Sequence, residues 1–147
     1  MQQLIRLGAK PDLPILAALG KTEEFLRLLP LSDSGQLHLA LALAAQYGHA
    51  GIVCVLLNAG EDPNRYNPSG AHSHSTPLHQ AALAGHLAVV KLLVEREARL
   101  DIKDVICRGT PAGWANHAGR TEVEAYLKER FRLEGASRLI LSDDCER

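Results

Sequence analysis

The stretch Thr76-Pro77-Leu78-His79-Gln80-Ala81-Ala82-Leu83-Ala84-Gly85-His86 decides the fold of this 147-residue chain. Thr76 can cap a helix whose first position is Pro77, where the missing N–H costs nothing. The leucine and the two alanines that follow fall at helical spacing, so the helix buries a narrow face of small residues. Gly85 ends the helix because glycine enters the left-handed conformation cheaply. The stretch therefore predicts a short, closely packed helix.

The same pattern recurs along the chain. A second copy starts at Thr110-Pro111, which lies 110 − 76 = 34 residues after the first. Upstream, Gly48-His49 precedes Gly85-His86 by 85 − 48 = 37 residues, and Gly20 marks a still earlier unit. A repeat of this length is typical of a solenoid, in which each unit packs on its neighbours.

These residues resemble the ankyrin repeat. The strongest matches are Thr76-Pro77-Leu78-His79 and Gly85-His86 in one unit, and Gly109-Thr110-Pro111 with Gly119 in the next. The resemblance covers about Leu4 to Arg130. It implies an all-α solenoid of stacked helix–turn–helix repeats joined by hairpin-like loops, and a role in protein recognition. In the family, the loop tips and the short inner helices form the concave binding face.

The repeats predict one ankyrin domain over residues 1–131 and a C-terminal tail over 132–147. Because the exposed end of a solenoid needs a cover, the tail is expected to be that cap or else a disordered end. The expected units are a partial one over 1–10, since Leu4 to Asp12 matches Leu56 to Asn64, and then 11–38, 39–75, 76–109 and 110–131.

Three departures from the pattern predict local differences. Leu39 to Ala42 replaces the Thr-Pro-Leu-His signature, so this unit is expected to lack its helix cap and its loop-tying histidine. The loop from Arg65 to Ser75 is longer than usual. Glu97 aligns with Gly60, so we expect left-handed backbone there, which a residue with a side chain adopts at a cost.

Composition and charge exclude several classes of protein. With 16 basic and 17 acidic residues the formal charge is −1, which argues against a nucleic-acid binder. No apolar run approaches the roughly 20 residues that span a bilayer, and Met1 to Lys10 lacks a secretory core. Cys54, Cys107 and Cys145 are odd in number and far apart, which disfavours disulfides. We therefore expect a cytoplasmic protein.

The histidines offer a route to chemistry. His72 and His74 can face one side of an extended loop with His79 close by, as zinc ligands would require. No cysteine or carboxylate is near in sequence to complete a tetrahedron. By the resemblance, His79 and His86 instead tie backbones together through ring hydrogen bonds. A metal-binding or histidine-dependent activity centred on residues 65–79 stays as an alternative.

The leading prediction is a non-enzymatic module that binds another protein and holds no cofactor. No catalytic triad, phosphate-binding glycine loop or pair of catalytic carboxylates is evident in the sequence. We expect a monomer; the alternatives are dimerisation through the incomplete N-terminal repeat, or a fragment of a longer array that a partner completes. Trp114 is expected either to pack in the core or to anchor a partner. The residues expected at the binding face are Gln46, Tyr47, Tyr66, His72, Ser73, His74, Leu83, Ala84, Ile106, Arg108 and His117.

Overall fold

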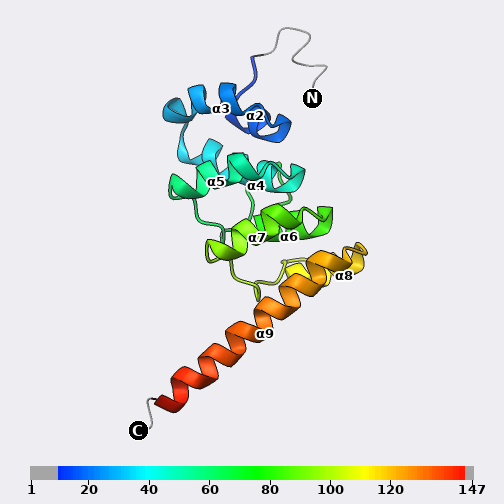
Figure 1. Cartoon of the computed structure of the whole chain (residues 1–147). Helices are drawn as coiled ribbons and strands as arrows, with labels where there is room; N and C mark the ends of the chain where they lie inside the picture. Colours follow the sequence, from blue (N-terminus) through cyan, green and yellow to red (C-terminus); the bar gives the residue numbers. More distant parts are fainter. Residues whose placement is uncertain (1–9, 145–147) are drawn as a thin grey trace.

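The computed structural model describes the backbone of residues 10–144 and the side chains of residues 10–138. The partial unit expected over residues 1–10 therefore lies outside the described residues except for its last position. Helices alternate with turns and loops along this part of the chain (Figure 1). Their bounds are α2 Leu13–Leu19, α3 Thr22–Leu28, a 3₁₀ turn η1 Leu29–Leu31, α4 Ser34–Tyr47, α5 Ala50–Asn58, α6 Pro77–Ala84, α7 Leu87–Glu95, α8 Pro111–His117 and α9 Thr121–Asp144.

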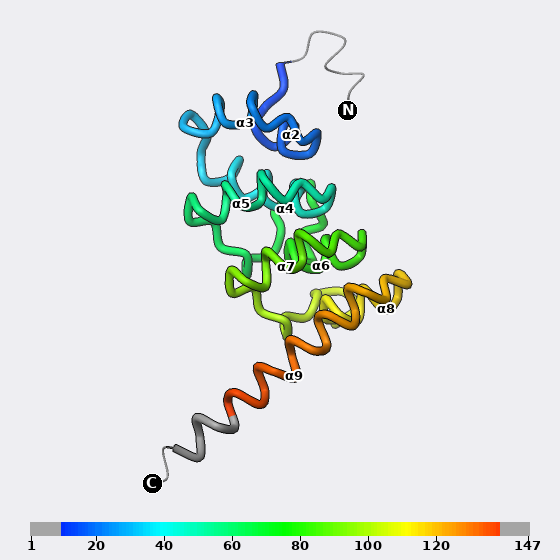
Figure 2. The backbone as a smooth tube through the Cα atoms, in the orientation of Figure 1, coloured from blue at the N-terminus to red at the C-terminus, as the bar shows by residue number. Residues whose placement is uncertain are grey.

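The helices form two rows, as the ankyrin resemblance implies. The inner helices α2, α4, α6 and α8 contact one another in that order, and the outer helices α5, α7 and α9 do the same. Figure 2 shows the backbone passing from α5 to α6 and from α7 to α8 through extended loops. The architecture is an all-α solenoid of helix pairs, which confirms the predicted fold class.

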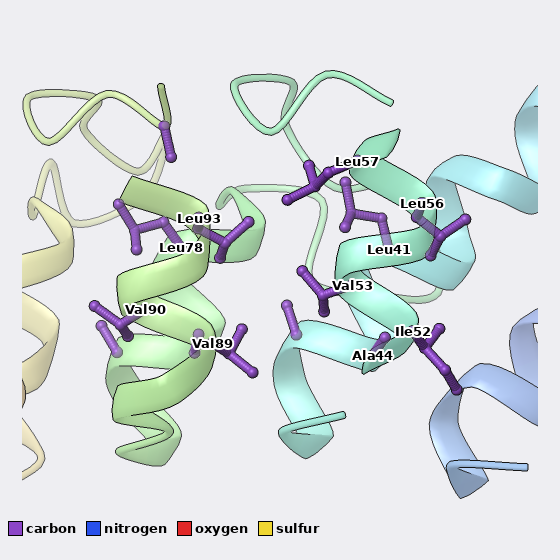
Figure 3. Packing of buried hydrophobic residues seen from close by; sticks show 14 of the residues in the cluster. Leu41, Ala44, Ile52, Val53, Leu56, Leu57, Leu78, Val89, Val90 and Leu93 are labelled. Atoms are coloured by element: carbon purple, nitrogen blue, oxygen red, sulfur yellow. The ribbon is translucent and has the colours of Figure 1, made fainter. Parts of the chain in front are cut away.

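The core is built from small residues on the inner helices and branched ones on the outer helices. Because inner positions such as Ala44 and Ala81 are fully buried alanines, neighbouring helices approach closely. Figure 3 shows Val53 of α5 and Val89 of α7 among the larger side chains that fill the space between successive units. Each buried branched side chain contributes about 1.5–3 kcal/mol by leaving water.

The cap predicted to be missing from the second unit is present. The inner helix α4 begins at Ser34 rather than near Leu39, and Asp33 caps it. The Asp33 carboxylate accepts the Gln36 N–H at 2.8 Å, and the Gln36 side chain accepts the Asp33 N–H at 3.4 Å. The prediction was wrong because it sought a threonine at one alignment position, whereas an aspartate and a glutamine make the same reciprocal cap six residues earlier.

The histidine predicted to be missing from that unit also has a substitute. His38 is buried on α4, and its Nε2 donates to the Tyr66 carbonyl at 2.7 Å. In the next unit, His79 Nε2 donates to the Gly109 carbonyl at 3.1 Å. Both rings therefore hold the loop that follows their own unit, although their positions in the repeat differ.

Each inner helix before α8 ends at a left-handed glycine that the next unit covers. Gly20, Gly48 and Gly85 have φ values of 68°, 81° and 81°. A side chain from the following unit packs where a Cβ would stand and donates to the carbonyl two residues earlier. The three ties run from His49 Nε2 to the Ala18 carbonyl (3.0 Å), from His86 Nε2 to the Gln46 carbonyl (3.1 Å), and from Arg120 Nε to the Leu83 carbonyl (3.1 Å).

The last helix differs most from the expected organisation. Helix α9 has 24 residues, whereas the preceding outer helix α7 has nine. It runs without interruption through the position between residues 131 and 132, where the sequence placed the start of a tail. Figure 1 shows its second half projecting beyond the stack. Repeat signatures end near residue 131, but helix formation does not depend on the repeat, which explains the difference.

Glu97 adopts the left-handed backbone predicted for it, with φ 67°. We expect Glu97→Gly to stabilise the protein by about 1 kcal/mol, because the strain of a side chain in this conformation is removed. A gain of this size raises Tm by a few degrees in a domain of this size. The control is Glu97→Ala, which loses the carboxylate but keeps the Cβ and should give no comparable gain. A lower Tm for the glycine variant would contradict the prediction.

The glycine ties can be separated from backbone strain by comparing two glycines. In Gly48→Ala the new Cβ would lie 2.6 Å from His86 Nδ1, whereas at Gly119, which has φ 71°, it meets nothing within 4 Å. Both variants pay about 1 kcal/mol of strain, and Gly48→Ala should lose about 1 kcal/mol more with the displaced His86 hydrogen bond. Urea unfolding measures the difference, and equal losses in the two variants would show that the tie contributes nothing.

Candidate partner-binding surface

The candidate residues on the inner helices lie together at the helix ends. Gln46 and Tyr47 end α4, Leu83 and Ala84 end α6, and His117 ends α8. The ties at His86 and Arg120 hold these three ends side by side. Tyr47 is 48% exposed and His117 is exposed, while Gln46 and Ala84 are half-buried. We call these five residues the helix-end surface: Gln46, Tyr47, Leu83, Ala84 and His117.

The remaining candidates lie on the two long loops, which we call the loop-tip surface: Tyr66, His72, Ser73, His74, Ile106 and Arg108. The loops are joined by a hydrogen bond from the Val105 N–H to the His74 carbonyl, at 2.9 Å. His72, Ser73, Ile106 and Arg108 are exposed, and Ile106 is 69% exposed. The loops therefore present adjacent side chains to solvent, as expected.

The structure does not bring the two surfaces into one patch. The loops enter α6 and α8 at the N-terminal ends of these helices, and the helix-end surface lies at their C-terminal ends. The eight residues of α6 separate the surfaces by about 12 Å. A partner that contacted both would have to lie along the inner helices.

One buried aspartate holds the second loop. Asp104 is fully buried and accepts hydrogen bonds from four N–H groups. Burial by itself raises the pKa of Asp104, but these hydrogen bonds outweigh it and lower the pKa to about 2. The loop is therefore built around a carboxylate that stays charged. Its donors are the backbone of Ile106 (3.0 Å), Cys107 (2.6 Å) and Gly109 (2.7 Å), and the Trp114 indole (3.0 Å).

His79 links this loop to the helix that precedes it. Its Nε2 donates to the Gly109 carbonyl, which leaves Nδ1 to accept the Thr76 N–H at 3.2 Å. Burial has the largest effect on His79 and holds its pKa below the ordinary value, although the Gly109 hydrogen bond and the Asp104 charge act in the opposite direction. The ring is therefore neutral near pH 7, and the structural role predicted for His79 is confirmed.

The histidine-centred alternative does not fit this geometry. Both ring nitrogens of His79 are engaged with protein atoms, so neither is free to bind a zinc ion. His72 and His74 lie edge to face, with ring centroids 6.0 Å apart. Among the described residues, no group of three His, Cys, Asp or Glu side chains could hold a metal. The loop sequence suggested a ligand cluster because it brings three histidines close in sequence but not in orientation.

Trp114 has a role that neither prediction described. It is half-buried, it donates to Asp104, and its ring packs against His74 and His79 with centroids 5.7 and 5.1 Å apart. Trp114 therefore fixes the loop-tip surface rather than filling the core. Tyr66 is similar, since its hydroxyl donates to the Lys103 carbonyl at 2.8 Å and joins the two loops.

A family model of ankyrin repeats (3 copies) matches residues 3–104 and again residues 41–134. The chain belongs to the ankyrin repeat family. Ankyrin repeats are protein–protein interaction modules, which agrees with the predicted class of function.

Curated ankyrin relatives have dissimilar names. Cyclin-dependent kinase inhibitor 2A of Monodelphis domestica is 32% identical over 120 residues, which cover 79% of this chain and 68% of the relative. Ankyrin repeat and SAM domain-containing protein 6 of Mus musculus is 41% identical over 69 residues, or 47% of this chain and 8% of the relative. Ankyrin repeat and SOCS box protein 3 of Bos taurus is 30% identical, and the match covers 23% of that relative. The chain thus spans less than a tenth of the mouse protein.

Among the described residues, no helix is both long enough and apolar enough to cross a membrane.

Sequence reasoning missed Val105, which is 59% exposed beside Ile106. It also missed Asp104, because its four donors are spread from Ile106 to Trp114 and leave no local motif. The aspartate five residues before Gly109 was the available signal.

Asp104→Asn tests whether the buried charge holds the loop. An amide cannot accept all four hydrogen bonds, so we expect a loss of about 2 kcal/mol in unfolding free energy. Because the folded pKa is about 2 and the ordinary value is 3.8, this stabilisation is complete above pH 3.8 and is lost as the pH falls toward 2. Urea unfolding across this range should show that the difference between wild type and Asp104→Asn shrinks with acid.

The control for the aspartate variant is Asp101→Asn. Asp101 is exposed and pairs with Arg99 at 2.9 Å, an arrangement that contributes little to stability. A loss at Asp101 as large as the loss at Asp104 would mean that a general charge effect is responsible.

Proposed function

We propose that this chain is a non-enzymatic module that binds a protein partner through its concave face, with the helix-end and loop-tip surfaces as contact regions. The observation that carries the proposal is the exposure of apolar side chains on backbone that is already held in place. Ile106 is 69% exposed, yet its N–H is bound by the buried Asp104 carboxylate. Ordering such a side chain in a complex costs little entropy, because its backbone does not have to be fixed on binding.

The side chains on these surfaces suit a protein partner. Tyr47 offers an aromatic ring that is 48% exposed at the end of α4. Arg108 is exposed on the second loop, two residues beyond Ile106. Tyrosine and arginine are enriched among the residues that dominate binding energy at protein interfaces. Mixed aromatic, apolar and basic character on the exposed loop tips and helix ends favours a folded protein surface over a small molecule.

The relatives support the class of function but not one partner. Their names refer to a kinase inhibitor, a SAM domain and a SOCS box, and two of the three names include the ankyrin repeat. The identity of the partner therefore has to come from experiment. Completion of a longer array by a partner stays a prediction, and so do the absence of enzymatic activity and the cytoplasmic location.

The proposal is tested with Tyr47→Ala and Arg108→Ala. Affinity capture from the native cell identifies the partner, and calorimetric titration of the purified pair measures Kd. Both side chains are exposed, and an alanine at position 108 keeps the Cβ of a residue already at φ 59°, so folding should be preserved. Each change should raise Kd about ten-fold, or about 1–2 kcal/mol.

The matched control reverses charges on the outer helices, with Glu95→Lys on α7 and Glu129→Lys on α9, both exposed. These changes should leave Kd within about two-fold, since they lie away from the proposed contact surfaces. Loss of binding in the control, with normal binding by the Tyr47 and Arg108 variants, would place the partner on the outer face and refute the proposal.

A further inference from the structure

A groove runs along the open end of the stack, separate from the surfaces described above. It lies between the loop at residues 100–103, helix α8 and helix α9, and has a volume of about 630 Å³. Cavities of about 300–1,000 Å³ accommodate a bound ligand or several side chains. No residue of the helix-end or loop-tip surface lines it. Its apolar lining comes from Leu100, Ala112, Leu127 and Phe131.

The groove continues the internal interface of the solenoid. In the stack, α4 covers α2, α6 covers α4 and α8 covers α6. Ala112 and Asn116 lie on the face of α8 that borders the groove, where a further unit would stack. Phe131 at its edge is 57% exposed. An apolar face of this kind is stabilised when another helix covers it.

Helix α9 extends this face beyond the stack. Residues 131–138 are exposed except for Glu134, which is half-buried, and the helix continues to Asp144. The projecting part has 144 − 131 + 1 = 14 residues. A helix of that length is marginal in water without packing partners. Residues 131–144 are therefore the part of the described chain that a partner helix would stabilise most.

The charges along the groove side of α9 are self-complementary. Glu124 and Lys128 precede Phe131 by 7 and 3 residues, and Glu134 and Arg138 follow it by 3 and 7. All five side chains line the groove or its continuation. Two antiparallel copies related by a two-fold axis at Phe131 would place Glu124 opposite Arg138 and Lys128 opposite Glu134. A parallel pair would oppose like charges at each of these positions, so it is disfavoured.

We propose that the partner at this end is a second copy of the chain, and that the two α9 helices cross antiparallel at Phe131. The phenylalanine of each copy covers the open end of the other stack. Within one chain Lys128 pairs with Glu124, but its side chain is 67% exposed and can also reach a partner carboxylate. This interface is isologous, since the same residues serve both copies. This dimer differs from the expected monomer. Residues 132–147 carry no repeat signature, so the sequence does not indicate that α9 continues to Asp144 and offers an interface there.

Sedimentation velocity over a dilution series tests the proposal. The monomer has a mass of 15.9 kDa, and we expect a shift toward twice that value as the concentration rises. Phe131→Asp should raise the dimer Kd about ten-fold or more. Leu31→Asp is the control, because Leu31 is 82% exposed at the far end of the stack and should leave association unchanged. A monomer at every concentration, or association lost in the control alone, would overturn the proposal.

Charge exchange then tests the antiparallel register. In the dimer, Lys128→Glu places a glutamate opposite Glu134 of the other copy, and Glu134→Lys places a lysine opposite Lys128. Each variant alone should therefore associate more weakly than wild type. Mixing the two variants restores both opposite-charge pairs, as does the double variant Lys128→Glu/Glu134→Lys in one chain. Recovery supports the register even if Phe131→Asp fails to fold. Failure of both rescues would exclude this pairing, whatever the outcome for the partner-binding surface.

Discussion

The stack depends on side chains that reach from one unit to the unit before it. Each of them packs over a glycine, where the lack of a Cβ leaves room for it. A helix leaves its last carbonyl groups without intrahelical donors. Here the carbonyls of Ala18, Gln46 and Leu83 receive a ring or guanidinium N–H from the next unit. Helix termination and unit stacking are therefore one contact, so neither forms fully without the other. That coupling explains how short helices, unstable alone, become ordered in a row.

The loops are held in the same way, because the side chains of Asp104 and His79 make hydrogen bonds to backbone groups at other positions in the chain. Asp104 gathers three backbone N–H groups and one indole N–H, and His79 holds the Gly109 carbonyl from the preceding unit. Because these anchors lie beneath the surface, Ile106 and Arg108 can vary in chemistry without disturbing the loop that carries them. Such a division between anchoring and exposed residues is what a recognition loop needs.

The sequence was informative where the chemistry is local and periodic. Helix faces and glycine ends follow from spacing, the left-handed Glu97 follows from alignment, and the roles of His79 and His86 follow from the ankyrin resemblance. It failed where a different residue does the same work, as at Asp33, or where partners are distant, as at Asp104. The sequence also does not reveal that the loop tips and helix ends are separated by the length of α6, because spacing along the chain alone does not give distances in space.

The two proposed interfaces are compatible because they share no residue. Self-association uses α9 and the open end of the stack, whereas the partner-binding surfaces lie on the loops and inner helix ends. A dimer through α9 would therefore present two binding faces at a fixed separation. For a partner that is itself repeated or clustered, the second contact becomes intramolecular, and avidity can exceed single-site affinity by about 10²–10⁴. The long final helix thus offers a physical route from one modest binding face to strong attachment, without any change in that face.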